Sequence, residues 1–99
     1  MDDRFVMPLL ILDFFATWCE PCKWSDPIIE EVIRELGDTV ELKRIDIDKE
    51  QDTVSRFSVR SVPTFVLLDG EQEIWRMNGF DTSSKMLSEI RAAIYRRDK

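Results

Sequence analysis

LLILDFFATWCEPC, residues 9–22, is the stretch that decides the fold of this chain. Its first half, Leu9 to Phe15, is almost continuously apolar, as expected for a strand that is covered on both faces. Its second half holds both cysteines of the chain, Cys19 and Cys22. Pro21 suits the first turn of a helix, where its missing N–H costs nothing. The stretch therefore predicts a buried strand that leads into a cysteine pair at the start of a helix.

Hydrophobic spacing predicts the elements that follow this stretch. Apolar residues recur at helical spacing from Cys22 to Leu36, Gly37 is a candidate C-cap, and Pro27 should kink this helix. The remaining pattern predicts a strand over 40–47, a short helix over 48–57, strands over 64–68 and 72–77 joined by a turn at Asp69-Gly70, and a last helix that begins at Thr82 or Ser83. This order predicts an α/β fold, in which a central mixed four-stranded sheet is flanked by three helices.

Composition limits the classes of function. The 99 residues suit one domain over 1–99, and 43% hydrophobic with 34% charged residues is typical of a globular chain. The net charge of −6 argues against a nucleic-acid partner. No apolar run approaches the roughly 20 residues needed to cross a bilayer. Asp2 and Asp3 have the wrong charge for a signal peptide, so we expect a cytoplasmic protein without a membrane partner, although a signal or anchor removed ahead of Met1 is compatible with the sequence.

The cysteine pair suggests redox chemistry. Two cysteines are too few for a disulfide scaffold, and only a thiolate attacks a disulfide. Cys19 should lie just before a helix, where backbone N–H groups and the helix dipole stabilise a thiolate. Cys22 falls one turn later and could resolve a mixed disulfide from inside. Two alternatives remain, a zinc site completed by carboxylates or a second chain, and a pair of inert core thiols.

The chain resembles the thioredoxin family at several separated places. The matching segments are Leu12 to Lys23, Pro27, Val62-Pro63-Thr64 and Gly79. The resemblance implies a thioredoxin fold and a protein-disulfide reductase that works as a thiol–disulfide oxidoreductase without a cofactor. It also implies disulfide-containing protein substrates, a thioredoxin-reductase-like electron donor and a monomer. A redox-inert or regulatory binding module that uses the groove beside Pro63 is the alternative function, and a metal-bridged dimer is a third.

The same resemblance assigns residues around the cysteines. It implies a cis peptide bond before Pro63, and a shallow apolar groove around Cys19 lined by Trp18, Val62, Pro63 and Gly79. For Val62 the alternative is core packing, and for Pro63 it is an ordinary turn.

Asp13 lies within the apolar strand, where a carboxylate is costly to bury. Its pKa should therefore be raised. The resemblance implies that Asp13 exchanges protons with Cys22 through water; the alternative is an edge residue that reaches solvent. Thioredoxins place a lysine near this acid, and Arg44 takes that position here unless the register shifts to Lys43. An arginine would favour ionised Asp13, but Arg44 could equally lie on a solvated face.

The chain departs from the family pattern at two places. Glu20 replaces a glycine between Cys19 and Pro21, and its charge should oppose thiolate formation at Cys19 and make the couple more reducing. An exposed Glu20 with little effect is the alternative. The second departure is the short segment 1–8 ahead of the apolar strand, which predicts that the strand over 40–46 becomes an edge, unless residues 2–7 pair with it as a short extra strand.

Overall fold

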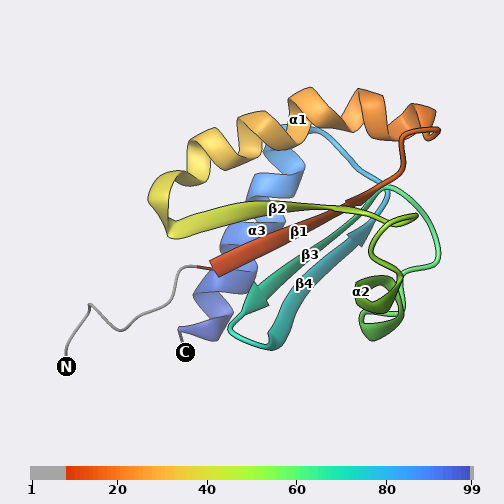
Figure 1. Cartoon of the computed structure of the whole chain (residues 1–99). Helices are drawn as coiled ribbons and strands as arrows, with labels where there is room; N and C mark the ends of the chain where they lie inside the picture. The colour runs from red at the N-terminus through yellow and green to blue at the C-terminus, as the bar shows by residue number, and fades with distance from the viewer. Residues whose placement is uncertain (1–8, 99) are drawn as a thin grey trace.

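A computed structural model describes residues 9–98, which form one four-stranded sheet and three α-helices (Figure 1). The elements, in chain order, are β1 (Leu9–Phe15), α1 (Glu20–Leu36), a 3-10 turn (Gly37–Thr39), β2 (Val40–Asp46), α2 (Gln51–Arg56), β3 (Thr64–Asp69), β4 (Gln72–Asn78) and α3 (Ser83–Arg97). None of the helices within this part of the chain is long and apolar enough to cross a membrane.

The sheet has the strand order β2-β1-β3-β4. β1 pairs in parallel with β2 through the α1 crossover, whereas the β1–β3 and β3–β4 pairs are antiparallel. The predicted fold class, a mixed four-stranded sheet flanked by three helices, is confirmed. Within residues 9–98, β2 has a paired neighbour on one side only, as expected for an edge strand. The suggested extra strand over 2–7 lies outside the described residues.

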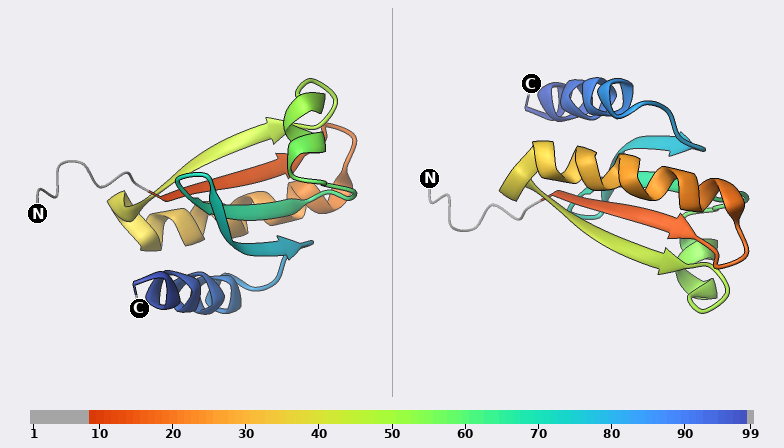
Figure 2. Two further views of the ribbon diagram at one scale, coloured as in Figure 1. Left: turned by 90° about the horizontal axis from the view of Figure 1, so that it is seen from below. Right: turned by 90° about the horizontal axis from the view of Figure 1, so that it is seen from above.

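Alternation along β1 divides its side chains between two apolar layers. Leu9 and Ile11 pack with the inner faces of α1 and α3, while Leu12 and Phe14 pack with residues around α2. Figure 2 shows α1 and α3 on one side of the sheet and α2 on the other. Asp13 has the same parity as Leu9 and Ile11, so this carboxyl group faces the layer that contains α1.

Local chemistry fixes the ends of the two long helices. Cys19 is the N-cap of α1, which therefore begins at Glu20, two residues before the apolar pattern predicts. Gly37 ends α1 as its C-cap with φ of 63°, a left-handed conformation that glycine adopts without steric cost. Thr82 caps α3 by accepting a hydrogen bond from the backbone N–H of Lys85. The N-cap position of Cys19 places the cysteine pair where the chain passes from β1 into α1.

Candidate active site

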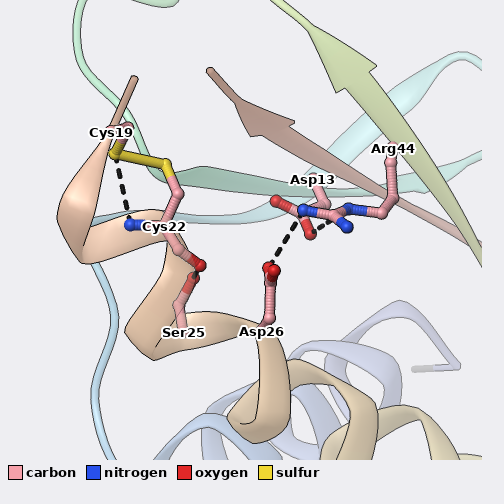
Figure 3. A network of polar contacts seen from close by, with 6 residues as sticks. All are labelled: Asp13, Cys19, Cys22, Ser25, Asp26 and Arg44. Atoms are coloured by element: carbon pink, nitrogen blue, oxygen red, sulfur yellow. Dashed lines mark hydrogen bonds and ion pairs between the residues drawn. A yellow bond between two sulfur atoms is a disulfide. The ribbon is translucent and has the colours of Figure 1, made fainter. Parts of the chain in front are cut away.

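Cys19 and Cys22 form a disulfide at the N-terminus of α1 (Figure 3). Their Cα atoms lie 5.3 Å apart. The Sγ atom of Cys19 accepts a hydrogen bond from the backbone N–H of Cys22, at 3.2 Å. This donor is one of the N–H groups that the first helical turn leaves without a backbone partner. It would stabilise negative charge on the Cys19 sulfur in the reduced protein.

Exposure does not distinguish the two cysteines, because each is 3% exposed in the disulfide form. Their positions on α1 do distinguish them. Cys19 precedes the helix and receives its N–H group, whereas Cys22 lies inside the first turn, on the buried face of α1. Pro21 lies between them in that turn, as its missing N–H allows. This asymmetry favours attack by Cys19 and resolution by Cys22.

Asp13 is buried on the α1 side of β1, with 1% of its surface exposed. The alternative that it reaches solvent is therefore wrong. The β1–β2 register places Asp13 opposite Arg44, not Lys43. Nε of Arg44 lies 3.3 Å from Oδ2 of Asp13. The Arg44 side chain nevertheless keeps 43% of its surface exposed, so it both contacts Asp13 and reaches solvent.

Burial dominates the proton affinity of Asp13. The pKa of this carboxyl group is raised from 3.8 to about 6, mainly because burial disfavours the charged form; the Arg44 guanidinium opposes the rise and the nearby charge of Asp26 adds to it. The predicted direction is confirmed. A carboxyl group with this pKa can both release and accept a proton near neutral pH, which general acid–base chemistry requires.

The structure adds two residues of α1 that the sequence did not single out. Asp26 receives a hydrogen bond from Nη2 of Arg44 at 2.9 Å. Ser25 is buried and donates its hydroxyl to the backbone oxygen of Cys22. Both follow Cys22 within one helical turn, and Asp26 stands at the i+4 position from it. That spacing was the signal that could have identified Asp26.

Glu20 is exposed beside Cys19 and pairs with Lys23. Nζ of Lys23 lies 2.9 Å from Oε1 of Glu20, an i,i+3 contact along α1. The Lys23 ammonium therefore offsets part of the charge that Glu20 presents to Cys19. Exposed ion pairs of this kind are weak, so the influence of Glu20 is reduced without being cancelled.

An apolar pocket of about 330 Å³ adjoins the cysteines and contains two of the four predicted groove residues, Trp18 and Val62. Its other lining residues come from the segment around α2, and sequence analysis did not single them out: Ile47, Val54, Val59, Arg60 and Ser61. The exposed indole of Trp18 donates from Nε1 to Asp48 at 2.9 Å, which holds the ring over the pocket. Val62 also packs into two apolar clusters, so its core role and its lining role coexist.

Pro63 and Gly79 lie next to this pocket without lining it. The Val62–Pro63 peptide bond is cis, as the resemblance implied. Pro63 is buried, and its carbonyl oxygen accepts a hydrogen bond of 2.7 Å from the backbone N–H of Gly79. This bond holds the loop after β4 against the segment before β3. Within residues 9–98, no three His, Cys, Asp or Glu side chains gather as a metal site.

Comparison with known proteins gives one consistent result. A family model described as Thioredoxin matches residues 4–92. Thioredoxin Y, chloroplastic, of Oryza sativa subsp. japonica is 31% identical over 85 residues, which cover 86% of this chain and 51% of that protein. A thioredoxin of Bacillus subtilis is 42% identical over 64 residues, which cover 64% of this chain and 62% of that protein. The chain thus spans between half and two thirds of the length of these two curated relatives.

A solved structure matches over most of both chains. The germline-specific thioredoxin protein Deadhead of Drosophila melanogaster is 33% identical, with a TM-score of 0.78 over 86% of this chain and 80% of that one.

Proposed function

This chain belongs to the thioredoxin family, and we propose that it reduces protein disulfides through a dithiol–disulfide cycle of Cys19 and Cys22. The observation that carries the proposal is the Cys19–Cys22 disulfide at the N-terminus of α1, with the Cys19 sulfur on a backbone N–H donor. A helix N-terminus stabilises a thiolate, and the thiolate is the nucleophile in disulfide exchange.

The cycle moves two electrons to the substrate. The Cys19 thiolate attacks one sulfur of a substrate disulfide, forms a mixed disulfide and releases one substrate thiolate. Cys22 then loses its proton and attacks the Cys19 sulfur. This step re-forms the disulfide of the protein and releases the second substrate thiolate. A dithiol donor that resembles thioredoxin reductase in role returns two electrons to the Cys19–Cys22 pair.

Asp13 is the proposed acid–base partner of Cys22. Its burial on the α1 side of β1 and its pKa of about 6 support this role, because the group changes protonation near the working pH. It would take the Cys22 proton before the second attack and return a proton when the disulfide is reduced again. The site residues thus divide into two thiols and one proton carrier.

The pocket beside Trp18 and Val62 supports a role in holding the substrate. It offers apolar side chains next to the cysteines, with Arg60 at its margin. An extended, partly apolar segment on either side of the substrate disulfide would fit such a surface. We propose the cytoplasm as the compartment of the reaction, because a reductase needs surroundings that keep its donor reduced. We propose a monomer as the active species on the resemblance to thioredoxins.

Reduction of insulin by dithiothreitol, followed by turbidity, tests the function. We expect the protein to accelerate precipitation, Cys19→Ser to abolish the acceleration, and Cys22→Ser to accumulate a mixed disulfide with insulin. A Ser84→Ala variant, changed at an exposed site on α3, is the control and should retain full activity. An unaccelerated reaction with the parent protein would favour the alternative, a binding module that uses the pocket beside Val62.

A further inference from the structure

One charged group beside the cysteines has no part in the cycle above. Asp26 on α1 shares the guanidinium of Arg44 with Asp13 (Figure 3). We propose that Asp26 is a positioning residue, which draws Arg44 away from Asp13 and so sets the proton affinity of Asp13. The inference rests on the proposed function, since it concerns the same proton carrier.

The two contacts of Arg44 are unequal. Nη2 of Arg44 donates a hydrogen bond to Oδ1 of Asp26 at 2.9 Å. Nε of Arg44 lies 3.3 Å from Oδ2 of Asp13, and among residues 9–98 this buried oxygen has no hydrogen-bond partner. The aligned bond therefore goes to the partly exposed acid. Oδ2 of the buried acid lies near the guanidinium without a well-formed hydrogen bond, although a bidentate pair is the geometry that an arginine and a carboxylate prefer.

Phe15 limits how far the guanidinium can turn. The central carbon of the Arg44 guanidinium lies 4.4 Å from the centroid of the Phe15 ring, a cation–π contact. With the plane supported by Phe15 and one end held by Asp26, Arg44 is not free to present both nitrogens to Asp13. This arrangement limits how far Arg44 can offset the effect of burial, which is the main cause of the raised pKa of Asp13.

Within residues 9–98, Arg44 and Asp26 are the two charged groups that act on Asp13. β2 contributes Arg44, α1 contributes Asp26, and β3 places apolar Phe65 opposite Asp13. Asp26 acts on Asp13 in two ways with the same sign. Its own negative charge disfavours ionised Asp13, and its hold on Arg44 withholds a hydrogen bond that would favour ionised Asp13.

Two variants separate these effects. Asp26→Asn removes the charge and keeps an oxygen that Arg44 can donate to, while Asp26→Ala removes both. Carboxyl-carbon NMR titration of the oxidised full chain should show the pKa of Asp13 lower by about half a pH unit in Asp26→Asn and lower still in Asp26→Ala. The pH dependence of insulin reduction should move to lower pH in the same order. Glu30→Gln, which removes an exposed charge elsewhere on α1, is the matched control and should leave the pKa of Asp13 as it is in the parent.

The outcomes are distinct. An unchanged or higher pKa of Asp13 in both Asp26 variants, or an equal fall in Glu30→Gln, overturns the positioning role. An Asp13 signal that moves as expected in a protein that never accelerates insulin reduction would contradict the proposed function and leave the role of Asp26 intact. Asp13→Asn identifies the carboxyl signal, because it removes that resonance.

Discussion

At the scale of single residues, Asp13 should make the stability of the protein depend on pH. Its pKa is about 6 in the folded, oxidised protein, against an ordinary 3.8 in an unfolded chain. The folded state therefore holds the proton more tightly, and stability falls as the pH rises through the window between these values. The loss reaches about 3 kcal/mol once the folded carboxyl group is ionised, at 1.36 kcal/mol for each pH unit.

Asp13→Asn should remove this dependence. We expect urea unfolding of the oxidised proteins to show that the free energy of unfolding of the variant, relative to that of the parent, rises by about 2 to 3 kcal/mol from about pH 4 to about pH 7.5. The difference between variant and parent is compared at the two pH values, so that the stability lost with the Arg44 contact, which affects both measurements, cancels in part. Asp52→Asn, at an exposed acid of α2, is the control and should follow the parent at both pH values. A gain that is equal at both pH values would contradict the assignment of the raised pKa to Asp13.

Glu20 and Lys23 should shift the reduction potential in opposite directions. Glu20 disfavours a Cys19 thiolate, so Glu20→Gln should stabilise the reduced form and make the potential less negative, while Lys23→Gln should make it more negative. Because both side chains are exposed and paired, each shift should be on the order of 10 mV. Equilibration with glutathione measures both values. A reduction potential in Glu20→Gln that is unchanged or more negative than in the parent would contradict an effect of Glu20 on the Cys19–Cys22 couple.

Residue chemistry explains which parts of the site the sequence could predict. Both cysteines, Pro21 and Asp13 follow from a single continuous stretch, where spacing alone places them on a strand end and a helix start. The contact between Arg44 and Asp13 needed the register of two strands, which a one-residue shift would have reversed. Predicting the pocket would have required the tertiary structure, because Val54 and Val59 reach Trp18 only through the path of the chain around α2.

At the scale of elements, Thr82 fixes the start of α3. Its hydroxyl oxygen accepts the backbone N–H of Lys85 at 3.2 Å, one of the donors that the helix cannot satisfy itself. Thr82→Ala should cost about 1 kcal/mol in the free energy of unfolding, measured with urea. Thr82→Ser keeps the hydroxyl group and should lose little. Equal losses in the two variants would show that the methyl group, not the cap, is responsible.

The elements were predicted more accurately than their ends. β1 agrees at both limits, because Leu9 to Phe15 is an almost continuous apolar run, which a turn at Thr17 and Trp18 follows. α2 is shorter than the predicted range 48–57, since Ile47 to Lys49 form the turn that precedes it and Glu50 is its N-cap. Hydrophobic spacing says little about so short a helix, which contains no buried residue. The break in alternation after Leu42 is still compatible with one continuous strand, β2.

At the scale of the whole molecule, two apolar layers stabilise the sheet unequally. The layer with α1 and α3 includes buried residues from both long helices, whereas the layer with α2 contains buried residues from the strands alone. Val54 and Phe57 contact that second layer only as partly buried side chains. The segment around α2, which lines the apolar pocket beside Trp18 and Val62, is thus attached to the sheet by partly buried side chains.

Hydrogen exchange should reveal this difference. β3 pairs on both sides and is buried along Thr64–Leu68, so its amides should exchange only with global unfolding. The amides of Val54 and Phe57, which donate to Glu50 and Thr53 in the single turn around α2, should exchange at least about tenfold faster through local opening. Because Val54 lines the pocket, such opening would let the pocket reshape around different substrate segments. If the Val54 amide proved as protected as that of Val66 in β3, α2 would belong to the rigid unit, and the pocket would have to accept its substrates as it stands.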